Sequence, residues 1–536
     1  MKFNFLKHIL PAAAVALTAG LSSCVGDLDV DPIDPSTTME ADEIGLYTKC
    51  YANMALAGNT GANGDCDISG LDGGTTGFVR QLWNANELTT DESICCWGDP
   101  GIPQFNYNQW DASHPMLQGF YYRLYNGIGY CNHYLEAFPT TDATRAAEIR
   151  FLRAMYYYYL MDCYGNVPFT TVTPAENPKT MPRADLFNWI EQEIKAAQPS
   201  LLAPAVRNSS QEGYGRVDQD AANLLLARLY LNAEVYTGTP RWTEAKQYAE
   251  AVINGPHKLW LNGQNGWSAY QMLFMGDNGE SGASQEAVFA ILQDGLTTTS
   301  WGTSLFLMAS TWNKDMNEAG DYGTSEFWSG NRARSQLVYK FFPNGNVPEA
   351  GVAEMVAAAG DDRALFFGTD RTLAVDKPSE FTSGYSVAKF RNTYSNGGAG
   401  HSSQFVDMDY FFMRSAEAYL IAAEADLRED GDLSAAGLNY INALRSRANT
   451  TSVSKENCTL DYILDERSRE LYYEGFRRTD LIRYGYFGGE NSSKYLWEWK
   501  GGVRNGQGFE AFRNIFAIPY EDKNANPNII QNAGYN

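Results

Sequence analysis

Residues 141–164 read TDATRAAEIRFLRAMYYYYLMDCY and carry the strongest helical pattern of the chain. Thr141 or Asp142 can cap the first turn, because a short polar side chain accepts hydrogen bonds from its free backbone N–H groups. Gly165 ends the pattern and Pro168 prevents its restart. One face repeats side chains at helical spacing: Ile149, Leu152, Tyr156, Tyr159, Leu160 and Cys163. We therefore predict a long helix here, with the tyrosine run packed in the core.

Similar patterning around this helix predicts a mainly α-helical protein. The other predicted helices lie at 42–57, 185–197, 218–235, 243–254, 410–427, 433–447 and 460–473. The third and fourth of these form one pair, and the fifth and sixth form another. Small side chains suit close helix crossings in both pairs: Ala227, Ala245, Ala249, Ala418, Ala422 and Ala425. Such pairs are typical of tetratricopeptide-like stacking, although a strict repeat period is missing.

Two further regions lack helical patterning. Residues 58–120 and 256–405 are rich in glycine, asparagine, serine and aromatic side chains. We expect long irregular loops there, carried on a helical scaffold over about 39–255 and 406–485. Because loops on a rigid scaffold often hold binding residues, these two regions are the predicted binding surface.

The N-terminus has the pattern of an export signal. Two lysines precede a short apolar run, and small residues then lead to Cys24. The run is too short to span a membrane, which takes about 20 apolar residues. The pattern resembles the bacterial lipoprotein box, so we expect residues 1–23 to be a signal peptide, Cys24 to be lipidated and 24–38 to form an acidic tether. The alternative is an ordinary signal with a chance cysteine.

Composition excludes some functions. The chain has 536 residues and a formal net charge of −23, which disfavours binding to nucleic acid or anionic lipid. Eight cysteines are too few for a disulfide scaffold, and their spacing matches no zinc site. No nucleotide-binding or metalloprotease motif occurs. Neutral ligands remain open, and an aromatic content of 13% leaves enough rings to line a binding surface.

Several motifs, in order along nearly the whole chain, together resemble the SusD/RagB family. They are CVGDLDVDPIDP from residue 24, NELTTDE at 86–92, EIRFLRAMYYYY at 148–159, DCYGNVP at 162–168, GRVD at 215–218, RSAEAYL at 414–420, ERSRELYYEGFRRTDLIR at 466–483 and AIPYE at 517–521. The resemblance implies one SusD-like domain over 39–536 and a non-catalytic, lipid-anchored protein at the outer surface of the outer membrane. It also implies a partner, a TonB-dependent transporter of the SusC type.

The chain is similar above all to a starch-binding member of this family, which implies maltooligosaccharides as ligands. Sugar rings stack on aromatic side chains, and their hydroxyls bond to planar polar groups. Trp97, Trp301 and Trp328 have small or polar neighbours. The resemblance places Trp301 and Trp328 near two positions of the relative's aromatic arc, and Trp97 two residues beyond the third. Arg80 matches a polar contact, and Asp99 falls where the alignment slips. Core packing is the alternative for each tryptophan. Where the relative has an aromatic residue, this chain has Cys95.

Other readings stay open. The same fold could bind another glycan or a peptide, and a glycoside hydrolase would need two carboxyl groups about 5–9 Å apart, which no motif nominates. The acids and arginines of 466–483 are interpreted as a structural ion network. No cofactor is required, but the resemblance suggests a structural calcium ion near Asp277, Asp407 and Asp409. The alternative is that these are solvated loop acids.

Overall fold

The computed structural model describes residues 42–59, 61–63, 66–316 and 322–535. The chain divides into two compact units, Met1–Leu46 and Tyr47–Asn536. Only residues 42–46 of the first unit are described, and they include the start of helix α2. The expected signal peptide, Cys24 and the tether lie outside the described residues. Within the described ranges, no helix is both long and apolar enough to cross a membrane.

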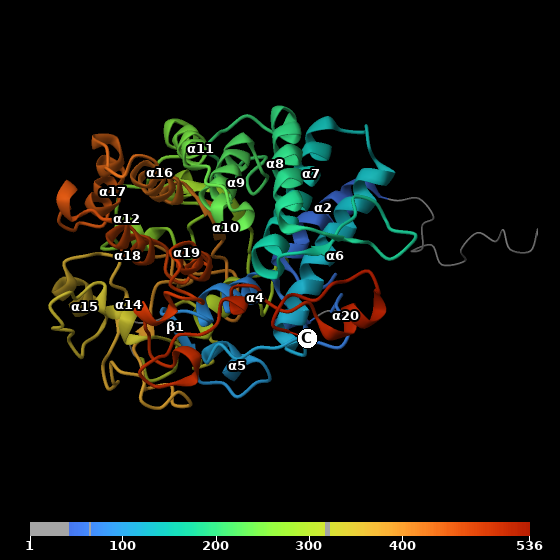
Figure 1. Cartoon of the computed structure of the whole chain (residues 1–536). Helices are drawn as coiled ribbons and strands as arrows, with labels where there is room; N and C mark the ends of the chain where they lie inside the picture. Colours follow the sequence, from blue (N-terminus) through green and yellow to red (C-terminus); the bar gives the residue numbers. More distant parts are fainter. Residues whose placement is uncertain (1–41, 60, 64–65, 317–321, 536) are drawn as a thin grey trace, which may run out of the picture. The chain divides into compact units, whose positions relative to one another are not determined.

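Helices dominate the second unit (Figure 1). The α-helices in the described residues are α2 (Glu43–Ala55), α3 (Gly73–Thr76), α4 (Phe78–Trp83), α5 (Ile102–Asn106), α6 (Pro115–Ala137), α7 (Ala143–Tyr164), α8 (Arg183–Ala197), α9 (Gln219–Leu231), α10 (Ala233–Thr237), α11 (Trp242–Asn254), α12 (Ala269–Met272), α13 (Ser304–Ala309), α14 (Ser335–Tyr339), α15 (Val352–Ala359), α16 (Ser415–Asp430), α17 (Ala435–Arg447), α18 (Leu460–Leu471), α19 (Arg477–Arg483) and α20 (Tyr520–Ala525). A π-helical turn, Asn84–Leu88, continues α4.

The strands are short and form two-stranded antiparallel sheets. They are β1 (Ser93–Cys95) with β5 (Asn331–Ala333), β2 (Val167–Pro168) with β3 (Thr180–Met181), β4 (Ala287–Ile291) with β8 (Tyr410–Arg414), and β6 (Phe366–Phe367) with β7 (Ser386–Val387). The strands therefore tie loops to one another rather than form a core of their own.

The long helices pack in sequence as a scaffold. Helix α6 lies against α7 and α7 against α8, while α9 packs on α11, α11 on α16 and α16 on α17. Figure 1 shows this row of helices from α7 to α17, with the loop-rich segments to one side of it. The predicted small crossing residues are fully buried, so the expected close helix pairs are confirmed.

The decisive helix 141–164 is confirmed as α7. The Asp142 carboxylate accepts hydrogen bonds from two backbone N–H groups of the first turn, and Gly165 ends the helix with a φ of 71°. Tyrosines 156–159 are all buried, as expected. The ring of Tyr156 also lies where a Cβ on Gly127 of α6 would stand, so the two helices approach closely at that glycine.

Two assignments made from the sequence were wrong. Residues 410–414 are strand β8 rather than helix, because they pair with β4 and every side chain there is buried, which removes the helical period. The second is the end of the expected loop region 58–120, because the 23-residue helix α6 begins inside it and runs on to Ala137, a stretch for which no helix was predicted. Its N-cap is His114, which is not a preferred capping residue, and its interior holds three glycines, so propensity does not mark it, although Pro115 at the first position is a start signal.

The acids and arginines of 466–483 form the predicted ion network. The carboxylates of Glu466, Glu470 and Glu474 are buried. Arg414 lies 2.7 Å from both Glu470 and Glu474, and Arg363 lies 2.8 Å from Glu466. Most of these partners come from distant parts of the chain, whereas the sequence suggested neighbouring helical turns. The network joins α18 to strand β8 and to the segment after α15.

Candidate functional site

Three predicted tryptophans converge. The ring centroids of Trp97 and Trp328 are 6.4 Å apart, and those of Trp328 and Trp301 are 6.1 Å apart. All three side chains are half-buried, so each presents part of its ring to solvent. The planes of neighbouring rings are tilted by 53° and 43°, so together the rings form a curved rather than a flat surface. We call Trp97, Trp328 and Trp301 the indole arc.

The β1–β5 pair brings two of these rings together. Cys95 is paired with Asn331 in the antiparallel ladder. Trp97 follows the first strand and Trp328 precedes the second, so this pairing brings the two tryptophans together. The Trp97 Nε1–H donates to the backbone oxygen of Trp328 at 3.0 Å. Gly330 is required here, because a Cβ on it would lie 2.3 Å from Trp97 Cε2.

The third ring is placed by the loop before α13. The carbonyl of Gly302 accepts a hydrogen bond from the backbone N–H of Arg80 at 3.0 Å, which ties this loop to the first turn of α4. Gly74 lets the loop approach, since a Cβ there would be 2.9 Å from Trp301 Cβ. Trp301 is thereby held beside Trp328, although the two are far apart in sequence.

Arg80 packs against the Trp97 end of the arc. Its guanidinium is 5.6 Å from the centre of the Trp97 ring and donates from Nη1 to the carbonyl of Gly74 at 3.2 Å. Its Nε is buried and has no hydrogen-bond partner among the described residues. Burial lowers the pKa of Arg80, and the nearby acids Asp72 and Asp99 act in the opposite direction. Asp99 itself is exposed. Both predicted polar residues therefore lie near the Trp97 end of the arc.

Cys95 takes no part in this surface. It is 1% exposed, and its backbone N–H and carbonyl bond to the side chain of Asn106 at 3.0 and 2.8 Å. Trp97, two residues further along, supplies the ring at this end of the arc.

The structure adds residues that the sequence reasoning missed. The ring of Phe405 lies 4.8 Å from that of Trp301 and extends the arc. Glu326 accepts the Trp328 indole N–H and a hydrogen bond from Gln404 Nε2, both at 2.8 Å. Phe405 has small and polar neighbours in the sequence, the same signal that singled out the tryptophans. Glu326 stands two residues before Trp328, but no spacing rule marks it.

The predicted calcium residues are only partly together. Asp407 and Asp409 line the same cavity of 270 Å³. The Asp277 carboxylate instead accepts both the backbone N–H and the hydroxyl of Ser395, at 2.9 and 2.7 Å. Burial raises the pKa of Asp409 to about 7, against hydrogen bonds that favour its charged form. Within the described ranges, no three His, Cys, Asp or Glu side chains group closely enough to hold a metal ion.

The geometry defines a class of protein. A helical scaffold holds a curved row of half-buried rings flanked by charged and amide side chains, which is the chemistry that grips the apolar faces and hydroxyls of sugars. This arrangement is typical of a carbohydrate-binding protein.

Comparisons with known proteins give the family. The SusD family model matches residues 238–535, and a model described as "Starch-binding associating with outer membrane" matches 80–231. The chain is 37% identical to the starch-binding protein SusD of Bacteroides thetaiotaomicron, over the full length of both. It therefore belongs to the SusD family.

Solved structures agree on the fold. A laminarin-binding SusD-like protein superimposes with a TM-score of 0.65 at 21% identity, covering 92% of this chain and 100% of that one. A SusD homologue from Bacteroides thetaiotaomicron gives a TM-score of 0.68 at 20% identity, covering 92% and 96%. These matches confirm the expected mainly helical SusD-like fold with long loops.

Proposed function

We propose that this protein binds starch and maltooligosaccharides at the cell surface and passes them to a TonB-dependent transporter of the SusC type. The observation that carries the proposal is the indole arc. An α-glucan chain is curved, so it can touch successive rings that are tilted by 43° to 53°, whereas a flat chain would meet only one of them. The full-length similarity to a starch-binding relative supports the same ligand.

The transporter partner and the anchoring at Cys24 rest on the family and on the sequence. One matching family model carries the outer membrane in its description. The lipoprotein pattern that ends at Cys24 supplies the means of attachment. Lipid attachment is tested by mass spectrometry of the N-terminal peptide, and Cys24→Ser should release the protein from the membrane fraction.

Affinity electrophoresis in gels that contain amylopectin tests the ligand. The wild type should be retarded, and the double variant Trp301→Ala with Trp328→Ala should be retarded much less. Trp242→Ala is the matched control, because Trp242 packs under Arg428 in the helical scaffold. Unchanged retardation of the double variant would refute the arc as the starch site.

Another glycan is the main alternative, since two solved relatives are named for laminarin or bound to laminarihexaose. A curved ring surface also suits a helical β-1,3-glucan. Parallel gels with laminarin, dextran, levan and mucin glycans separate these ligands, and a peptide ligand would leave all of them without effect. Incubation with maltoheptaose tests the hydrolase alternative, since a hydrolase would release shorter sugars.

We also propose that calcium binds beside Asp407 and Asp409. Their two carboxylates supply hard oxygen ligands, and the other ligands would be backbone oxygens or water, because calcium takes six to eight oxygens. Thermal unfolding with CaCl₂ or with MgCl₂ tests this. Only calcium should raise the melting temperature, and Asp409→Asn should abolish the rise.

A further inference from the structure

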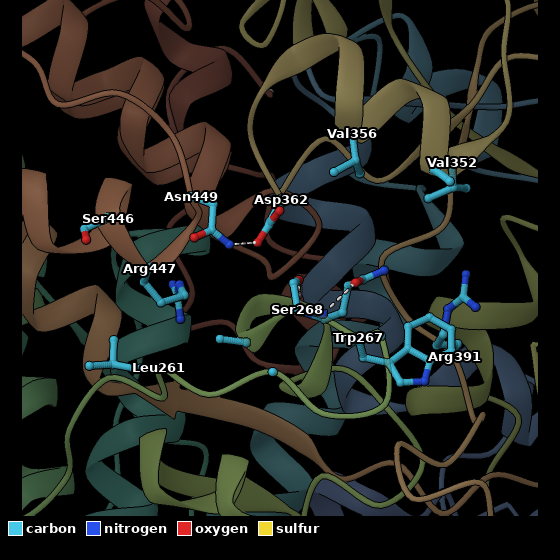
Figure 2. Close-up of a pocket in the computed structure, with 15 residues that line it drawn as sticks. Leu261, Trp267, Ser268, Val352, Val356, Asp362, Arg391, Ser446, Arg447 and Asn449 are labelled. Atoms are coloured by element: carbon cyan, nitrogen blue, oxygen red, sulfur yellow. Dashed lines mark hydrogen bonds between the residues drawn. The ribbon is translucent and has the colours of Figure 1, made fainter.

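A second cavity, of 750 Å³, shares none of its lining residues with the indole arc. The loop before α12, helix α15 and the end of α17 line it (Figure 2). Figure 2 shows Arg447, Ser446 and Asn449 on one side and Val352 and Val356 on the other. Its volume lies within the range of about 300–1,000 Å³ that is usual for small-molecule sites.

One wall carries an indole. Trp267 is half-buried, and the Arg391 guanidinium lies 4.9 Å from the centre of its ring. A tight turn positions this ring, because Gln264 and Trp267 exchange two backbone hydrogen bonds of 3.0 and 2.9 Å. Leu261, Val352 and Val356 add apolar surface to the same cavity. The cavity thus holds apolar groups that can meet the C–H face of a sugar.

The opposite wall is polar. Asn449 Nδ2 donates to Asp362 Oδ2 at 2.6 Å, which fixes an amide and a carboxylate side by side. Arg447 is 4% exposed, and within the described residues its Nε has no hydrogen-bond partner. Because a buried donor without a partner costs about 1–3 kcal/mol, a ligand hydroxyl in the cavity would relieve that cost. Ser446 adds an exposed hydroxyl to this wall.

The charges in the cavity largely balance. Arg447 is paired with Glu286 at 3.0 Å and also with Glu470. Arg391 and Asp362, which also line the cavity, carry opposite charges. A strongly charged ligand would therefore leave an unbalanced charge, whereas a neutral one with many hydroxyls would not.

We infer that this cavity is a second binding site for a short stretch of neutral glucan, separate from the indole arc. The class of sugar rests on the proposed function, and the site itself rests on the cavity. With two sites on one molecule, a long polymer can engage both at once. Polymer binding then gains from effective concentration, while a short oligosaccharide binds at each site independently.

Isothermal titration with maltoheptaose tests the inference. The wild type should bind two molecules, and either Val356→Trp, which fills the cavity, or the arc variant Trp301→Ala with Trp328→Ala should bind one. Glu354→Trp is the matched control, because it places the same ring on α15 at an exposed position that does not line the cavity. Retardation by amylopectin should fall at least severalfold for Val356→Trp and not for Glu354→Trp.

The outcomes separate the two proposals. A single site in the wild type that the arc variant loses and Val356→Trp keeps would overturn the second site and leave the arc intact. A site that Val356→Trp loses and the arc variant keeps would overturn the arc alone. If Val356→Trp fails to fold, Asn449→Gly serves instead. It removes the amide, and glycine tolerates the φ of 53° at that position.

Discussion

Removing the central ring of the arc should weaken starch binding more than removing any other single side chain. Trp328 is in ring contact with both other members, at 6.4 Å and 6.1 Å. Trp328→Ala deletes its own sugar contact, worth about 1 kcal/mol, and takes away the support that orients its two neighbours. We expect a total loss of about 1–2 kcal/mol in binding free energy, which corresponds to an affinity about 5–30-fold lower.

The same substitution should also affect stability. The two lost ring contacts are worth about 0.5–1.5 kcal/mol each, so the free energy of unfolding should fall by about 1–3 kcal/mol. Titration with maltoheptaose gives the affinity, and urea unfolding followed by circular dichroism gives the stability. Trp328→Phe keeps a ring and should recover most of both. A folded Trp328→Ala protein with wild-type affinity would refute the reasoning.

Three further predictions follow from single contacts. Arg414→Met should lower the free energy of unfolding by about 3–5 kcal/mol in urea, because it removes one cationic partner from each of three buried carboxylates. Against the effect of burial, arginines hold the pKa of Glu466 at about 2, below its ordinary 4.5. Its contribution to stability is therefore complete above pH 4.5 and should be lost as the pH falls toward 2 in acid unfolding curves. Gly330→Ala should displace the Trp97 ring and reduce amylopectin retardation, while Gly98→Ala, whose Cβ would contact nothing within 4 Å, should not.

Each of these predictions has an outcome that contradicts it. Wild-type stability of Arg414→Met would mean that the network contributes nothing net. A free energy of unfolding that does not change between pH 4.5 and 2 would show that Glu466 and its neighbours do not contribute to acid unfolding. Equal retardation of Gly330→Ala and Gly98→Ala would show that the position of Trp97 does not govern binding.

The sequence alone determined much of the scaffold. Local signals sufficed for α7, because Asp142, the spacing of its buried side chains and Gly165 all lie within one short stretch. The buried alanines of α9, α11 and α16 could be predicted for the same reason, since the spacing of small and apolar residues within each helix marks its packing face. Local information failed at β8, where pairing with a strand more than 100 residues away overrides helical propensity.

The site was decided by the tertiary structure. The composition of the loops nominated Trp97, Trp301 and Trp328, but only the β1–β5 register and the approach at Gly74 bring them into one surface. Phe405 joins that surface from a different loop. The ion partners of residues 466–474 also come mostly from distant segments. The sequence specifies the chemistry of each side chain. Which side chains become neighbours depends on how loops far apart in the chain are brought together, and no local pattern encodes that arrangement.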